Sequence, residues 1–116
     1  MKNETVDYIV TAREWVMART WDGRVTDRDA NPYRDCDLVY EGSNLEDAKE
    51  AADEYAAENP CEFFACGTDA AVSYIRFDFS KLDENGDYID FMHESSLTAQ
   101  DEERLKAYAD EIIDAL

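Results

Sequence analysis

Apolar and polar side chains alternate most strictly between Ala70 and Ser80. In an extended chain, one face of this segment carries Ser73, Ile75, Phe77 and Phe79, and the other carries Val72, Tyr74, Arg76 and Asp78. Alternation with a period of two is typical of a β-strand. The residue types and flanking turn signals predict two shorter strands, over residues 37–41 and 62–66.

The apolar positions of residues 5–19 fit both the two-residue period of a strand and the period of a helix. Their even-numbered apolar positions share one strand face, whereas other apolar residues of the segment approximate a helical stripe. The β-branched start of the segment favours a strand. Fifteen residues exceed the usual strand length, and Arg13 and Glu14 interrupt the apolar pattern. We therefore expect a bend, bulge or reversal at that point.

The chain reverses around Asn85 and Gly86, and the length of the loop decides which residues face each other. A two-residue Asn-Gly turn would pair Phe79 with Met92. A five-residue loop, 83–87, instead places four apolar residues together: Phe77, Phe79, Ile89 and Phe91. We prefer the longer loop, because the buried face sets the register of a strand pair.

Two segments have the apolar spacing of amphipathic helices. The first, residues 45–59, follows Ser43, a candidate N-cap that Glu46 would complete as a capping box. It ends before Pro60, since the residue preceding proline disfavours the helical conformation. The second, residues 99–116, follows Thr98 as its N-cap.

These elements predict one α+β domain over residues 1–116. We expect an antiparallel sheet of four to five strands with two acidic helices packed on one face, in the order β-β-α-β-β-β-α. Residues 20–36 are expected to form a long loop. The expected core contains Val10, Leu45, Ala52, Phe63, Ile75, Phe77, Phe91, Leu105, Ile112 and Leu116.

Negative charge sets this chain apart from an ordinary α+β domain. The formal net charge is −18, and −16 of it lies in residues 41–62 and 78–116. Four glutamates recur every fourth residue of the first helix, about 6 Å apart along its axis, and like charges at that spacing repel: Glu46, Glu50, Glu54 and Glu58. Three acids crowd the negative end of the second helix dipole: Asp110, Glu111 and Asp114. Helix stability selects neither arrangement, so we expect these seven residues to bind a partner.

The acidity also restricts the class of partner. Nucleic acid and anionic membranes are disfavoured as direct partners, because binding phosphates requires Lys and Arg. A basic protein surface is the natural complement. An acidic surface of the kind found in proteins from salty cytoplasms is the other interpretation, although residues 1–40 carry a net charge of only −2.

The location of the protein is inferred from its N-terminus and its cysteines. The N-terminus does not resemble a signal peptide, and no apolar stretch is long enough to span a bilayer. Cys36, Cys61 and Cys66 are an odd number without an export signal. We expect them to be reduced thiols in a cytoplasmic protein.

The residues give little support for catalysis or metal binding. The one histidine, His93, is expected to be a structural or surface residue rather than the base of a catalytic cysteine. Cys61 and Cys66 are five residues apart, which places them on opposite faces of a strand and argues against a zinc site. The two Asp/Asn-rich loops lack the ligand positions of a calcium-binding loop. We therefore expect no enzymatic activity, no cofactor and no metal.

The loop of residues 20–36 is the alternative contact surface. It carries Trp21, Arg28 and Tyr33. Aromatic and arginine side chains commonly anchor protein interfaces, although aromatic residues also serve core and loop packing.

Two resemblances bear on function. Small size, strong acidity, two acidic helices and an aromatic-rich sheet resemble the phage and mobile-element proteins that imitate nucleic acid, including anti-restriction and some anti-CRISPR inhibitors. Separately, the run Val39-Tyr40-Glu41-Gly42-Ser43, followed by Leu45, Glu46, Ala48 and Ala52, is similar to the strand-to-helix step of HicB-type antitoxins. The long loop 20–36 departs from that second family.

These observations lead to two functional hypotheses. The first is a nucleic-acid mimic whose acidic helices occupy the basic surface of a nucleic-acid-binding enzyme or complex in the host cytoplasm. The second is an antitoxin-like or regulatory subunit that binds its partner through the loop 20–36.

Overall fold

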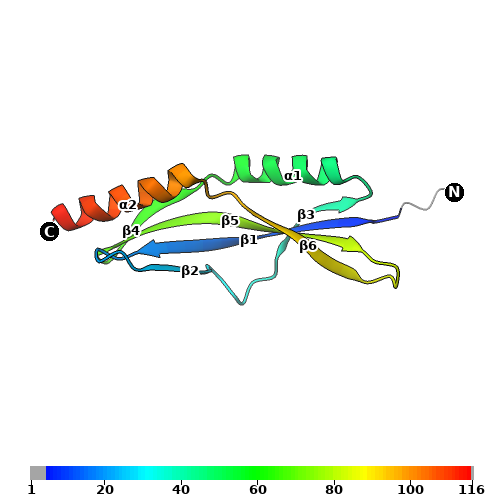
Figure 1. The fold of residues 1–116 in the computed structure, drawn as a ribbon, viewed down its shortest axis with the longest axis horizontal. Coiled ribbons are helices and arrows are strands. Elements are labelled where there is room, and N and C mark those ends of the chain that lie inside the picture. Colours follow the sequence, from blue (N-terminus) through cyan, green and yellow to red (C-terminus); the bar gives the residue numbers. More distant parts are fainter. Residues whose placement is uncertain (1–4, 116) are drawn as a thin grey trace.

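The computed structural model describes residues 5–115, which form six strands and two helices (Figure 1). In chain order they are β1 (Tyr8–Arg19), β2 (Val25–Asp29), β3 (Asp37–Gly42), α1 (Leu45–Glu58), β4 (Glu62–Cys66), β5 (Asp69–Leu82), β6 (Tyr88–Ser95) and α2 (Ala99–Asp114). All strand pairs are antiparallel. The predicted α+β class, with an antiparallel sheet and two helices, is confirmed. The sheet has six strands instead of the predicted four to five, and the order is β-β-β-α-β-β-β-α, with one strand more before α1 than predicted.

One strand lies inside the segment predicted to be a loop. Within residues 20–36, β2 pairs with β1 from Val25 opposite Arg19 to Asp29 opposite Trp15. Its β-branched start suits a strand, and the tight reversal before it uses Gly23 at φ 89°. The rest of the segment forms a turn at residues 20–24 and a loop at residues 30–36, between β2 and β3.

The two long strands β1 and β5 join two four-stranded halves. They pair along their length, from Tyr8 opposite Lys81 to Arg19 opposite Ala70. In one half β3 and β6 flank this pair, and in the other half β2 and β4 flank it. The molecule is accordingly elongated, with principal extents of 66 × 23 × 20 Å.

Of the bend, bulge or reversal predicted at Arg13 and Glu14, the chain reversal is wrong, and the one register shift in the pairing of β1 lies earlier, between Val10 and Thr11 opposite β3. Strand β1 runs through both residues without a shift in its pairing with β5. What changes there is the neighbour on the other edge, which is β3 up to Ala12 and β2 from Trp15 onward. The charged pair therefore marks a gap between two edge partners, which we call the waist of the sheet.

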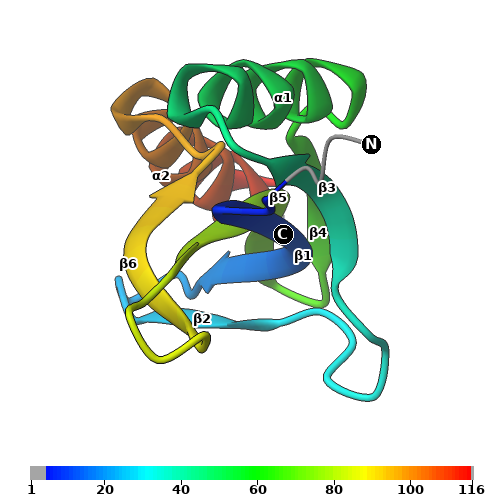
Figure 2. The ribbon, with the colours of Figure 1, turned by 90° about the vertical axis from the view of Figure 1, so that its right-hand side faces the viewer.

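The two helices pack on side chains that point to opposite faces of strand β5. Helix α1 covers Val10, Phe77 and Phe79, whereas α2 covers Val72 and Ala70, which point to the other face of β5. Both helices nevertheless lie along the same side of the molecule, as Figures 1 and 2 show. The twist of the long β1–β5 ribbon accounts for this, since it turns each face as the strands advance.

Most of the predicted core is confirmed. Buried residues are Val10, Ala52, Ile75, Phe77 and Leu105, and partly buried residues packed against them are Leu45, Phe63 and Ile112. The prediction that Phe91 belongs to the core is wrong, because this residue is 38% exposed. Leu116 lies outside the described residues.

The β5–β6 hairpin explains the misplaced Phe91. The loop has the predicted five residues, 83–87, and Lys81 pairs with Ile89. A bulge after that point shifts the register by one residue, so that Phe79 pairs with Met92. Met92 therefore packs against the core, and Phe91 lies at the surface beside Tyr8 and Lys81.

The N-cap predicted for α2 is confirmed, whereas the N-cap predicted for α1 is wrong by one residue. Asn44, not Ser43, is the N-cap of α1, and its side chain accepts hydrogen bonds from the backbone N–H groups of Glu46 and Asp47. The capping box expected between Ser43 and Glu46 does not form, because the helix begins at Leu45 and places Asn44 at the flanking position. Thr98 caps α2 as predicted, and Asp101 completes a capping box there.

Candidate interaction surface

The predicted acidic residues lie on the exposed surface of the two helices. The side chains of the first set, Glu46, Glu50, Glu54 and Glu58, are all exposed on α1. Those of the second set, Asp110, Glu111 and Asp114, are exposed on the last two turns of α2. Neither helix has a basic residue in its last turn. The structure therefore places all seven on the side of the molecule that carries the helices.

These carboxylates form no ion pair within residues 5–115. The four ion pairs of that range join Arg13 to Asp29, Arg24 to Asp22, Arg34 to Asp37 and His93 to Asp78. None of them involves an acid of α1 or α2. The arginine of α2, Arg104, instead stacks over the Phe63 ring at 4.4 Å. The helix carboxylates thus remain free to interact with groups outside the described chain.

The loop residues predicted as a second contact patch are exposed but separated. Trp21 is 66% exposed in the turn before β2, and Tyr33 is 98% exposed in the loop after β2. Arg28 is exposed on β2 itself. Because five strand residues, about 17 Å, lie between the turn and the loop, Trp21 and Tyr33 do not form one patch.

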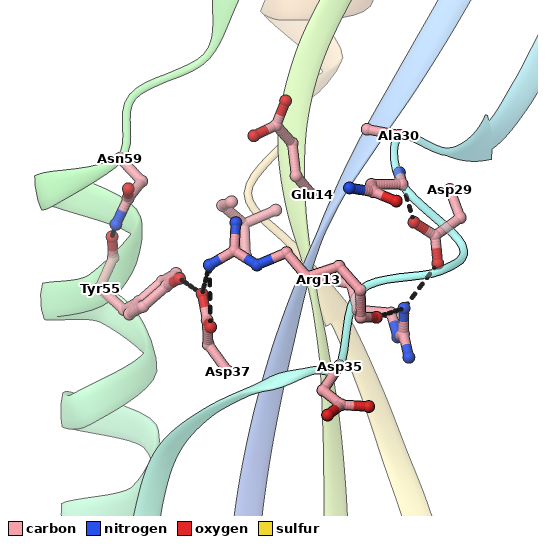
Figure 3. A pocket seen from close by; sticks show the side chains of 11 residues that line it. Arg13, Glu14, Asp29, Ala30, Asp35, Asp37, Tyr55 and Asn59 are labelled. Atoms are coloured by element: carbon pink, nitrogen blue, oxygen red, sulfur yellow. Dashed lines mark hydrogen bonds and ion pairs between the residues drawn. The ribbon is translucent and has the colours of Figure 1, made fainter.

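A cavity of about 370 Å³ lies at the waist, between α1, β1 and the loop before β3 (Figure 3). Sequence reasoning missed this cavity. Its wall brings together residues that are far apart in the chain, among them Arg13, Glu14, Asp29, Arg34, Asp37 and Tyr55. The one signal in the sequence was the charged pair Arg13 and Glu14, which interrupts the apolar pattern of β1.

Arg13 fixes the loop that borders the cavity. Its Nε donates to Cys36 Sγ at 2.9 Å, and its Nη1 donates to Asp29 Oδ2 at 3.0 Å and to the Arg34 carbonyl at 2.8 Å. The hydrogen bond to Cys36, followed by the proximity of Asp29, raises the pKa of the guanidinium above its ordinary value. Arg13 is consequently occupied by the protein itself.

A second cluster ties α1 to β3 across the cavity. The Tyr55 hydroxyl donates to Asp37 Oδ2 at 2.8 Å, and Arg34 Nη2 lies 3.2 Å from Asp37 Oδ1. Burial, reinforced by the adjacent Asp37 carboxylate, raises the pKa of Tyr55 to about 12. Asp37 and Arg34 thus neutralise each other, as Arg13 and Asp29 do.

A smaller hollow of about 190 Å³ adjoins this cavity and shares Glu14, Asn59 and Ile75 with it. Glu58 and Glu62 also line the smaller hollow. We call the two hollows together the waist groove. Glu58 is thus the one predicted site residue that also belongs to the groove.

The chemical groups considered for catalysis are dispersed. His93 Nδ1 lies 2.6 Å from Asp78 Oδ1 on the exposed surface of β6 and β5. Cys36, Cys61 and Cys66 are free thiols, and burial raises the pKa of Cys61. Within the range that the structure describes, no three His, Cys, Asp or Glu side chains are grouped as metal ligands.

In comparisons with known proteins, no family model, curated protein or solved structure matches this chain. Among the described residues, no helix is long and apolar enough to cross a membrane.

Proposed function

We propose that this protein is a non-enzymatic nucleic-acid mimic, in which the helix side of the molecule occupies the basic surface of a nucleic-acid-binding enzyme or complex. The observation that carries the proposal is the display of acids on both helices. Eleven of their twelve Asp and Glu side chains are exposed, and the twelfth, Asp101, caps α2.

The charge spacing supports nucleic acid as the structure that is imitated. Helix α1 has fourteen residues, so it is about 21 Å long. It carries six acids, or about one per 3.5 Å of axis, close to the phosphate spacing of about 3.4 Å along one DNA strand. A single lysine, Lys49, offsets them on this helix. A groove lined with Arg and Lys would therefore meet a similar density of negative charge.

The proposal explains why the helices keep an unfavourable charge arrangement. Repulsion between glutamates four residues apart costs stability in the free protein. A cationic partner surface removes that cost on binding and steers association, in a manner that salt weakens. The mimic would act in the cytoplasm, as anti-restriction and anti-CRISPR inhibitors encoded by phages do in the host cell.

A pull-down from host lysate at low and high salt tests the proposal. The test variant changes Glu46, Glu50, Glu54 and Glu58, here called the glutamate ladder, to Gln. A matched acidic control changes exposed acids outside the helices by the same total charge: Glu41→Gln, Glu84→Gln, Glu94→Gln and Asp87→Asn.

The expected result is that wild type and control retain a basic nucleic-acid-binding protein, which added DNA or RNA displaces, and that the ladder variant releases it. If the ladder variant retains the same partner regardless of salt and competitor, the proposed function fails.

The second candidate is an antitoxin-like or regulatory subunit that binds through the loop 20–36. The observation in its favour is the exposure of Tyr33, at 98%, and of Trp21, at 66%. In that case Trp21→Ala and Arg28→Ala would weaken partner retention more than the ladder variant does.

A further inference from the structure

The size and the lining of the waist groove indicate what kind of ligand it can hold. It is a concave surface formed by the two contiguous hollows, with volumes of about 370 and 190 Å³. The larger hollow falls within the size range of about 300–1,000 Å³ that is usual for ligand sites. Its lining, however, is charged and polar rather than apolar, which argues against a hydrophobic ligand.

The free charges of the groove are negative. Both of its arginines, Arg13 and Arg34, are paired with aspartates. Four further carboxylates line the two hollows, and within residues 5–115 their side chains form no hydrogen bond or ion pair: Glu14, Asp35, Glu58 and Glu62. A phosphate or carboxylate ligand would be repelled, whereas a cation would be attracted.

The end of helix α1 adds to this preference. Glu58 and Asn59, at the C-terminus of α1, both border the groove. A helix C-terminus carries a partial negative charge, which favours a cation nearby. No basic side chain of α1 occupies that position.

The groove also presents apolar surface to the stem of a long side chain. Ile75 lines both hollows, Tyr55 lines the larger one and Pro60 lines the smaller one. Arginine buries its aliphatic stem on such surface and offers a planar guanidinium that pairs with carboxylates in two-point contacts. Lysine offers only a single charged point.

We infer that the waist groove receives an arginine side chain from the basic partner, with Glu14 and Glu62 as its main carboxylate contacts. This inference rests on the proposed function, because it identifies where the partner inserts a side chain. It adds a recessed, arginine-selective contact to the long-range attraction of the helix side.

A peptide titration followed by amide NMR tests the inference. The probe is acetyl-Gly-Arg-Gly-amide, and the matched peptide contains citrulline, which has the same shape without the charge. We expect the arginine peptide, but not the citrulline peptide, to shift the amides of Ser73, Tyr74 and Asn59, which line the groove.

The double variant Glu14→Gln/Glu62→Gln should weaken peptide binding about tenfold, since it removes two charge-assisted contacts. A control with the same charge change, Glu41→Gln/Glu84→Gln, should bind like wild type. All four residues are exposed, and an unchanged dispersion of the amide spectrum verifies the fold of each variant.

Shifts confined to α1 and α2, or equal binding by the two double variants, would overturn the inference. The proposed function would then stand or fall separately, because the ladder variant keeps Glu14 and Glu62, the two proposed arginine contacts, and changes only Glu58 of the groove lining.

Discussion

Arg13 Nε donates a hydrogen bond to the Cys36 thiol at 2.9 Å, across 23 residues of sequence. Through this contact and those to Asp29 and the Arg34 carbonyl, one side chain of β1 holds both ends of the loop between β2 and β3. The loop crosses the gap where β1 changes its edge partner. Arg13 therefore substitutes for the strand pairing that is missing at the waist.

Replacing Arg13 by Gln should loosen this loop without disturbing the long ribbon. The amides of Asn31 and Arg34, which are hydrogen-bonded in the loop, should exchange several-fold faster with solvent. Amides of β5 that pair with β1 should keep their exchange rates. Arg28→Gln, which removes an exposed arginine of β2, is the control. Unchanged exchange at both loop amides would contradict the anchoring role.

The hairpin register predicts contrasting effects for two phenylalanines. Phe79 is 1% exposed in the α1 core, so Phe79→Ala should reduce the free energy of unfolding by about 3–5 kcal/mol. Phe91 lies at the surface, so Phe91→Ala should cost about 1 kcal/mol or less. Urea denaturation of both variants measures the difference. Comparable losses would mean that Phe91 belongs to the core and that the bulge is absent.

Local patterns predicted most of the elements, because they depend on neighbours in the sequence. The alternation in β5 and the Thr98 cap of α2 are examples, and both are present in the structure. Strand β2 was missed because its exposed residues provide no alternating buried face. Its stability comes from pairing with β1, which its own sequence does not reveal.

The waist groove could not be predicted, since it depends on tertiary structure. Tyr55 and Asp37, which meet across it, come from different elements 18 residues apart. The charges of Arg13 and Glu14 indicated an interruption in β1, but the partners of Arg13 are known only once the strands are paired. The helix acids were predictable, because a four-residue repeat follows directly from helix geometry.

The cap of α1 can be assigned by a pair of substitutions. Asn44→Ala should reduce the free energy of unfolding by about 1 kcal/mol, because two backbone N–H groups lose their acceptor. Ser43→Ala should change it by no more than about 0.5 kcal/mol. Thermal or urea denaturation distinguishes them. A larger loss for Ser43→Ala would restore Ser43 as the cap.

Stability should fall at high pH because Tyr55 binds its proton more tightly in the folded state. Its pKa is raised to about 12 from the ordinary value of 10. The stabilising contribution is complete below pH 10 and is lost as the pH rises through 12. The difference in phenolate absorbance between wild type and Tyr55→Phe should have its midpoint near pH 12. A midpoint near pH 10 would show that the Tyr55 hydroxyl is not buried against Asp37.

The glutamate ladder should destabilise the free protein by an amount that depends on salt. Three pairs of glutamates four residues apart each cost about 0.2–0.5 kcal/mol, so the four Glu→Gln substitutions should raise the free energy of unfolding by about 0.5–1.5 kcal/mol at low ionic strength. Near 1 M salt, where the screening length falls to about 3 Å, most of this gain should disappear.

The acidic control separates local repulsion from net charge. It removes an equal number of charges, four, from exposed positions outside the helices, where no four-residue repeat exists, so its gain in stability at low salt should be smaller. Equal gains for the two variants would attribute the effect to total charge rather than to the ladder. A ladder variant that is more stable yet releases the partner would indicate that the repulsion is retained for binding, because selection for stability alone would have removed it.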